Sequence, residues 1–103
     1  MSKSQRDKGK RFEREVVNTL KEHGFQAKRI PLSGSQEGFK GDIIFRKNDY
    51  SEELLGECKS RGSGFKLIYD SLEKDQADVL FIKQDRKDTL VVLSLENYIK
   101  TVS

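Results

Sequence analysis

The chain has very few of the residues that form disulfides, zinc sites and nucleophilic catalytic centres. Its 103 residues include one cysteine, Cys58, and one histidine, His23. A single cysteine excludes an internal disulfide and offers no zinc-site spacing, and a Ser-His-Asp or Cys-His centre has little support. We expect Cys58 to pack as a small buried hydrophobe and His23 to interact with the carbonyl groups at a helix end.

Long apolar runs and phosphate-cradling loops are also missing. No stretch approaches membrane-spanning length and the N-terminus is charged, which indicates neither export nor insertion. We therefore expect a reducing, intracellular setting, in the cytoplasm or nucleoid, and no membrane partner. The glycine-rich loops lack the Gly-Lys-Ser/Thr ending of nucleotide-binding loops, so nucleotide hydrolysis is not expected.

Composition and charge indicate one small domain with a basic N-terminus. Hydrophobic residues make up 34% and charged residues 36% of the chain, and no linker divides it. We predict a flexible basic lead at 1–6 and one domain at 7–103. The net charge is only +3, but basic residues crowd the first part of the chain. This clustering favours a polyanion such as nucleic acid, with a solvated helix face as the alternative.

The hydrophobic pattern predicts the order α-β-β-β-α-β-β-α. The first helix should begin with Asp7 as its N-cap and end before Gly24. Its apolar stripe consists of Phe12, Val16, Val17 and Leu20. Helices are expected at 7–23, 65–75 and 94–101, and strands at 25–32, 42–46, 53–60, 79–83 and 90–93.

These elements predict an α/β fold with a mixed β-sheet flanked by helices. Strands 42–46 and 53–60 are joined by a polar turn and should form an antiparallel hairpin. The helix between strands implies a crossover with some parallel pairing. The near-continuous apolar runs at 79–83 and 90–93 are typical of inner strands.

The candidate site consists of Asp42, which opens one strand, and Glu57 and Lys59, which close the next. Side chains at i and i+2 of a strand share a face, so Glu57 and Lys59 should project together, and pairing of the two strands adds Asp42. Hard cations such as Mg²⁺ prefer carboxylate oxygens, and the backbone carbonyl of Cys58 can add a ligand. Lys59 would then stabilise the attacking hydroxide or the negative charge on the phosphorus oxygens. Mn²⁺ is expected to substitute for Mg²⁺.

Glu13 is a further candidate ligand from the first helix. It borders the buried stripe, because it shares a helical side with Val17 and Leu20, and can reach the metal directly or through water. Each residue also has an ordinary explanation. Asp42 can cap a turn, Glu57 and Lys59 can form an exposed polar pair, and Glu13 can be a solvated helix residue. The conjunction of all four favours the catalytic interpretation.

These residues resemble the PD-(D/E)XK nuclease superfamily, and within it the archaeal Holliday junction resolvases and their small phage and bacterial relatives. Gly41-Asp42 stands at the "PD" position and Glu57-Cys58-Lys59 at the "E-x-K" position. The run from Lys8 to Glu15 is similar to the resolvases' first helix motif, and the likeness covers about the first two-thirds of the chain. It implies a restriction-endonuclease-like fold with an αβββαβ core.

The resemblance also implies roles for these residues. Asp42, Glu57 and Glu13 would be metal-site carboxylates, Lys59 the catalytic lysine, and either Ser33 or Ser35 a catalytic serine. Gly41 replaces the superfamily proline, which should be tolerable because that proline supplies no ligand. Basic residues near the site would contact DNA phosphates without sequence preference. They are Lys8, Lys10, Arg11, Arg14, Arg29, Lys40, Arg61 and Lys66.

The resulting prediction is a Mg²⁺-dependent endonuclease that nicks branched DNA, with the four-way junction as its expected substrate. Symmetrical nicking needs two active sites, so a homodimer is expected. One alternative is a nuclease of the same superfamily that acts on linear duplex or single-stranded DNA. The other is a nucleic-acid-binding module that keeps the fold without chemistry, which would leave the carboxylate cluster without a use.

Overall fold

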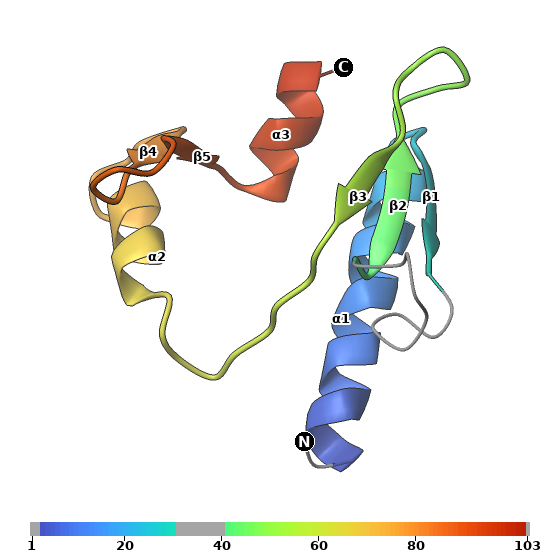
Figure 1. The fold of residues 1–103 in the computed structure, drawn as a ribbon, viewed down its shortest axis with the longest axis horizontal. Helices are drawn as coiled ribbons and strands as arrows, with labels where there is room; N and C mark the ends of the chain where they lie inside the picture. Colours follow the sequence, from blue (N-terminus) through green and yellow to red (C-terminus); the bar gives the residue numbers. More distant parts are fainter. Residues whose placement is uncertain (1–2, 31–40, 103) are drawn as a thin grey trace. The chain divides into compact units, whose positions relative to one another are not determined.

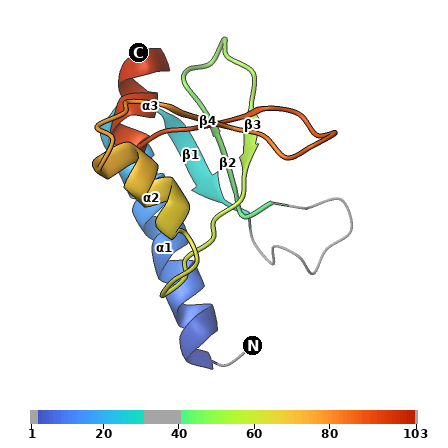
Figure 2. The same ribbon diagram turned by 90° about the vertical axis from the view of Figure 1, so that its left-hand side faces the viewer.

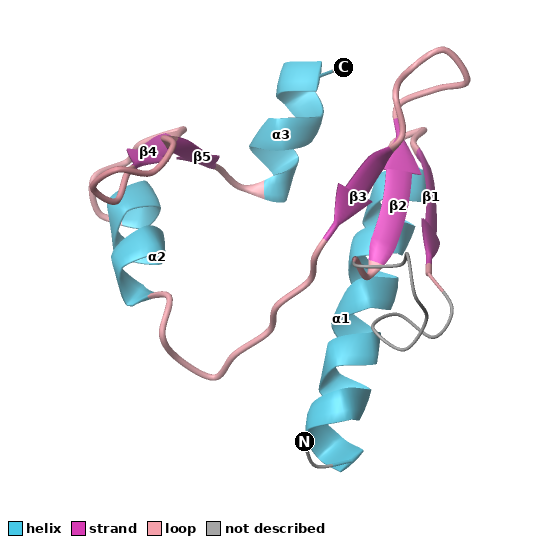
Figure 3. Ribbon diagram, viewed as in Figure 1, coloured by secondary structure: helices cyan, strands magenta, loops and turns pink. Residues whose placement is uncertain are grey.

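The computed structural model describes residues 3–30 and 41–102, and the chain divides into two compact units, Met1–Ser60 and Arg61–Ser103. Helices and strands of the described residues follow the predicted order α-β-β-β-α-β-β-α (Figure 1, Figure 3). Within this described part, no helix is both long and apolar enough to cross a bilayer. The expected element order is confirmed.

Helix α1, Lys3–Glu22, begins four residues earlier than predicted. Asp7 therefore lies inside the helix and is not its N-cap. The residues before it, Ser-Gln-Arg, include no glycine or proline, so nothing in them stops the helix from extending. The predicted apolar stripe is confirmed, with Val17 and Leu20 buried. This stripe is the surface through which α1 packs on the strands of its unit.

A glycine ends α1 and turns the chain back toward the first strand. Gly24 has a φ of 89°, a left-handed conformation that favours glycine, and the N–H of Phe25 donates to the carbonyl of Leu20 at 3.0 Å. Nδ1 of His23 lies 2.9 Å from the carbonyl oxygen of Thr19. The predicted C-terminal glycine and the predicted histidine–carbonyl contact are therefore both confirmed.

Three strands form an antiparallel sheet beside α1, in the order β1-β2-β3 (Figure 2). They are β1 (Gln26–Arg29), β2 (Ile43–Arg46) and β3 (Leu54–Gly56). Ile43 is only 2% exposed, and Phe25 and Ile30 at the two ends of β1 are also buried. These side chains and the α1 stripe form the core of the first unit. The candidate site residues lie at the end of the sheet where β2 begins and β3 ends.

Gly56 is packed so closely that a side chain does not fit. An added Cβ would lie 2.7 Å from Cγ1 of Ile43 and 3.5 Å from Cε1 of Phe45. Because Ile43 is buried and cannot move aside, we expect Gly56→Ala to lower the free energy of unfolding by about 1–3 kcal/mol in urea denaturation. Gly9→Ala in α1 is the control, since its Cβ would meet nothing within 4 Å. It should raise stability by about 0.5–1 kcal/mol. Equal stabilities of the two variants would contradict this packing.

The second unit consists of two helices and a β-hairpin. Its elements are α2 (Lys66–Glu73), β4 (Leu80–Ile82), β5 (Leu90–Val92) and α3 (Leu95–Val102). Strands β4 and β5 pair antiparallel, and α2 contacts β4. Oγ of Ser94 accepts a hydrogen bond from the N–H of Asn97 at 3.1 Å, so Ser94 caps the N-terminus of α3.

Strand pairing differs from the prediction in the second unit. Strands β4 and β5 form a two-stranded sheet, so neither is an inner strand. A tight turn, in which the N–H of Lys87 donates to the carbonyl of Gln84 at 3.0 Å, pairs them with each other. Each is apolar, yet Phe81 and Leu90 are exposed. Every pairing among the described strands is antiparallel, so the parallel pairing expected from the crossover is not among them.

Candidate active site

Asp42 and Glu57 flank the paired ends of β2 and β3. Ile43 pairs with Gly56 in the antiparallel register, and the N–H of Asp42 donates to the carbonyl of Gly56 at 2.8 Å. This hydrogen bond is one residue out of the register, so the ladder itself does not set Asp42 directly opposite Glu57. The two carboxylates nevertheless interact, because Asp42 raises the pKa of Glu57. The expected closeness of these two carboxylates is therefore seen at the end of the hairpin.

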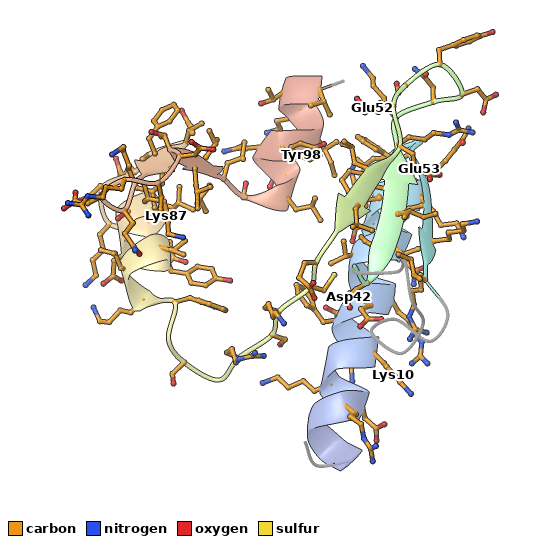
Figure 4. All side chains as sticks on the ribbon, in the orientation of Figure 1. Lys10, Asp42, Glu52, Glu53, Lys87 and Tyr98 are labelled. Carbon is orange, nitrogen blue, oxygen red and sulfur yellow. The ribbon has the colours of Figure 1, made fainter. Side chains whose placement is uncertain are left out.

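The side chain of Asp42 fixes the segment that follows β3. Strand β3 ends at Gly56, earlier than the predicted strand 53–60, so Glu57 to Lys59 lie beyond it. There Oδ2 of Asp42 accepts a hydrogen bond from the N–H of Cys58 at 2.7 Å. Beyond β3, the side chain of Asp42 therefore accepts a backbone hydrogen bond of the kind that backbone carbonyls accept within the sheet. Figure 4 shows Asp42 at the end of the sheet, beside α1.

Glu57 interacts with one negative and one positive neighbour. A hydrogen bond with Asp42 raises the pKa of Glu57, and partial burial and the negative charge of Asp42 add to the increase. The ammonium of Lys59 opposes it, with Nζ 3.7 Å from Oε1 of Glu57. Both side chains of this ion pair are more than half exposed. Two carboxylates that repel each other in this way favour a proton or a cation between them.

Glu13 is bound by arginine and does not join this pair. Its Oε1 lies 3.1 Å from Nε of Arg29, and its side chain is 14% exposed. Glu13 is therefore not the solvated helix residue of the ordinary explanation. No group of three or more His, Cys, Asp or Glu side chains in the described ranges is placed to hold an ion in this arrangement, so Glu13 as a metal ligand stays a prediction. The guanidinium of Arg29 takes the place beside Glu13.

The ion pair of Arg29 with Glu13 was not predicted from the sequence, in which Arg29 was expected to contact DNA. A signal was present. Ala27 is the apolar residue of β1, and Arg29 follows it by two residues in the same strand. The two-residue alternation of a strand therefore directs Arg29 to the side covered by α1, where Glu13 lies.

Gly41 has a packing requirement of its own. A Cβ at this position would lie 2.5 Å from Cγ of Leu55 and 3.0 Å from the carbonyl oxygen of Gly56. A proline carries a Cβ, so at this position it would require the exposed side chain of Leu55 to move aside and would lie close to the Gly56 carbonyl. The glycine lets β3 approach the residue just before Asp42.

Cys58 is half-buried next to the acidic residues. Burial raises the pKa of its thiol to about 11, and the negative charges of Asp42, Glu13 and Glu57 contribute. The thiol therefore stays protonated at neutral pH, although Cys58 is only partly buried and is not the buried hydrophobe expected from the sequence. The direction of the Cys58 carbonyl is not established by these contacts, so its role as a metal ligand stays a prediction.

Alkylation of Cys58 is expected to be slow. A pKa of about 11 in place of the ordinary 9.0 lowers the thiolate population at neutral pH about 100-fold. The rate of iodoacetamide labelling should fall accordingly below that of a free thiol and recover when the protein is unfolded in urea. Labelling of the folded protein at the free-thiol rate would contradict the burial of Cys58 among carboxylates.

The donor set fits a hard cation. Mg²⁺ is typically held by one or two carboxylates, with water and substrate phosphate completing its ligands. Asp42 and Glu57 supply two interacting carboxylates; their hydrogen bond is the main cause of the raised pKa of Glu57, and a cation would offset the negative charge of Asp42 that adds to it. The paired geometry therefore suits an ion that keeps most of its positions for water and a phosphate.

The other predicted site residues are distributed over both units. Lys8, Lys10, Arg11 and Arg14 are exposed on α1, where Figure 4 shows Lys10. In the second unit, Lys66 forms an ion pair with Asp70 and Arg61 also has an interaction partner. Ser33, Ser35 and Lys40 lie outside the described residues.

Comparison with known proteins gives a match over most of the chain. Residues 4–96 match the family model described as archaeal Holliday junction resolvase (Hjc). A segment of 55 residues is 46% identical to the crossover junction endodeoxyribonuclease Hje of Sulfolobus acidocaldarius. That segment is 53% of this chain and 38% of the relative's length. No solved structure shows significant similarity.

Proposed function

Because the chain belongs to the archaeal Holliday junction resolvase family, we propose that it is an endonuclease that nicks four-way DNA junctions. Nucleases of this family depend on a metal ion. The observation that carries the proposal is the interaction of the Asp42 and Glu57 carboxylates, with Lys59 paired to Glu57. Two carboxylates and an ammonium on one side of a strand end are what metal-assisted phosphodiester hydrolysis requires.

In this proposal Asp42 and Glu57 hold Mg²⁺ or Mn²⁺, with the Cys58 carbonyl as a further ligand. When bound, the ion polarises a phosphate oxygen and lowers the pKa of water. The hydrogen bond from Cys58 N–H orients the carboxylate of Asp42. The ammonium of Lys59 is exposed and near Glu57, so it can turn toward the phosphate and stabilise the negative charge that develops there. Ser33 or Ser35 would complete the catalytic set.

The basic residues are proposed to bind the DNA backbone. Lys8, Lys10, Arg11 and Arg14 are exposed on α1, the helix that also carries Glu13. Contacts of lysine and arginine with phosphates give affinity that falls with salt but no sequence preference. The proposed set is completed by Arg29, Lys40, Arg61 and Lys66. Binding of this kind suits a nuclease that recognises the shape of a junction.

Two catalytic sites are needed to nick a junction symmetrically, so the proposed active form is a homodimer. Within each subunit, 7–103 would act as one nuclease domain. The proposed location is the cytoplasm or nucleoid, where the DNA substrate is found.

The test is cleavage of a labelled four-way junction in Mg²⁺, compared with linear duplex and single-stranded DNA of the same sequence. We expect the wild type to cut the junction fastest and Asp42→Ala to leave it intact. Faster cutting of linear DNA would favour a superfamily nuclease with another substrate. Tight, salt-sensitive binding without cleavage would favour a non-catalytic module. Equal cleavage by Asp42→Ala would exclude the proposed site.

A further inference from the structure

The ion pair between Glu13 and Arg29 connects α1 to the strand end that carries Asp42. Arg29 is the last residue of β1, and the N–H of the following Ile30 donates to the carbonyl of Asp42 at 2.9 Å. The backbone next to Arg29 is therefore hydrogen-bonded to Asp42, which holds the two residues at the same end of the sheet. Its guanidinium lies 3.1 Å from Glu13, which places an acidic side chain of α1 at the same end of the sheet.

Two positively charged side chains lie among three carboxylates in this region. Lys59 pairs with Glu57, and Arg29 pairs with Glu13. All three carboxylates lie close enough to the Cys58 thiol for their charges to affect it. Glu13 thus lies near the same thiol as Asp42 and Glu57, and it is neutralised by a guanidinium. A divalent ion approaching Glu13 would be repelled by that positive charge, so Arg29 lowers the affinity of Glu13 for a metal ion.

Arg29 is also suited to leave Glu13 for a different anion. Its side chain is about one-third exposed, whereas that of Glu13 is mostly buried. A guanidinium binds phosphate through two parallel N–H donors, and its recorded bond to Glu13 is made through Nε. A DNA phosphate at the site can therefore replace the carboxylate as the partner of Arg29 without leaving the guanidinium unpaired.

We propose that Arg29 exchanges Glu13 for a DNA phosphate when the substrate binds, which frees the Glu13 carboxylate for the metal ion. This inference rests on the proposed function and adds a regulatory step to the same site. Arg29 is here a positioning residue that controls Glu13. Because coupling between two ligands is reciprocal, DNA should strengthen metal binding and metal should strengthen DNA binding by the same factor.

The first experiment measures Mn²⁺ affinity without DNA, by electron paramagnetic resonance of the unbound ion. Arg29→Gln should bind Mn²⁺ about tenfold more tightly than the wild type, because Glu13 is released. Arg29→Lys keeps a cation beside Glu13 and should bind Mn²⁺ like the wild type. Lys28→Gln is the matched control, since it removes the same charge from the exposed face of β1. Adding Glu13→Gln to Arg29→Gln should abolish the gain.

Unchanged or weaker Mn²⁺ binding by Arg29→Gln would overturn the proposal, as would an equal gain in Lys28→Gln. Circular dichroism of each variant excludes misfolding as the cause, and the Arg29→Lys protein supplies a comparison with the positive charge retained. Absence of saturable Mn²⁺ binding in every protein would overturn both the exchange and the metal site.

The second experiment measures the reciprocal effect on DNA. Fluorescence anisotropy gives junction affinity with and without Mn²⁺ in a Lys59→Ala background, where cutting is slowed. Mn²⁺ should strengthen binding about tenfold more when Arg29 is present than in Arg29→Gln. Equal effects of Mn²⁺ in both would contradict the exchange. Cleavage by the wild type with no such coupling would refute only this inference, and coupling without cleavage would refute only the nuclease proposal.

Discussion

Replacing Lys59 by alanine is expected to slow junction cleavage about 10²- to 10³-fold while leaving the fold and DNA affinity nearly unchanged. The ammonium lies next to Glu57 and is more than half exposed, so its loss creates neither a cavity nor a buried unpaired charge. What is lost is a positive charge that stabilises the transition state, and removal of one such group typically has an effect of about this size. Single-turnover cleavage with saturating protein measures it directly.

Two further variants separate this role from general charge effects. Lys59→Arg keeps the charge but replaces a compact ammonium with a planar guanidinium, so it should recover only part of the rate. Lys47→Ala removes an exposed lysine from the turn between β2 and β3 and should cleave like the wild type. Similar losses in Lys59→Ala and Lys47→Ala would contradict a specific role for Lys59.

Replacing Glu57 by glutamine is expected to abolish cleavage and to remove the stabilisation of the protein by Mg²⁺. An ion bound only by the folded protein stabilises it by about 2.7 kcal/mol at 100 times its dissociation constant. Glutamine lacks the negative charge that retains a hard cation. Thermal unfolding with and without Mg²⁺ should therefore show a rise in Tm for the wild type and no rise for Glu57→Gln.

Without metal, the Glu57→Gln variant should be slightly more stable than the wild type at neutral pH. The hydrogen bond with Asp42 raises the pKa of Glu57, so the folded protein binds this proton more tightly than the unfolded chain. The resulting stability is fully present below the ordinary pKa of glutamate and is lost as pH rises through the raised value. Without Mg²⁺, Glu57→Gln should avoid this loss and melt slightly above the wild type at pH 7.

Glu53→Gln is the matched control for both measurements. Glu53 precedes β3 and Glu57 follows it, so the two glutamates flank opposite ends of one strand, and Figure 4 shows Glu53 at the end away from Asp42. Glu53→Gln should retain both the Mg²⁺ effect and the pH dependence. A wild type that gains no stability from Mg²⁺, or a Glu53→Gln variant that loses the gain, would contradict a metal site at Glu57.

The sequence predicted the first unit well because its signals are local. The stripe on α1, the glycine at its C-terminus and the strand order need only spacing and turn residues. The closeness of Asp42 and Glu57 also follows from local rules, because the β2–β3 hairpin brings together the two chain segments that flank it.

The remaining features depend on contacts between distant residues. Glu13 and Arg29 lie on different elements, and periodicity places each near the core boundary without showing that they bind each other. The apolar runs of β4 and β5 indicate strands but do not show how many neighbours each has. The start of α1 was missed because Asp7 is a good N-cap residue, although nothing before it stops the helix.

A crystal structure of the protein soaked in Mn²⁺ tests the central claim most directly, because anomalous scattering locates the ion. The account predicts a peak within coordination distance of carboxylate oxygens from both Asp42 and Glu57, and no such peak in Glu57→Gln. Ions bound only elsewhere, with these two carboxylates contacting protein groups alone, would contradict it.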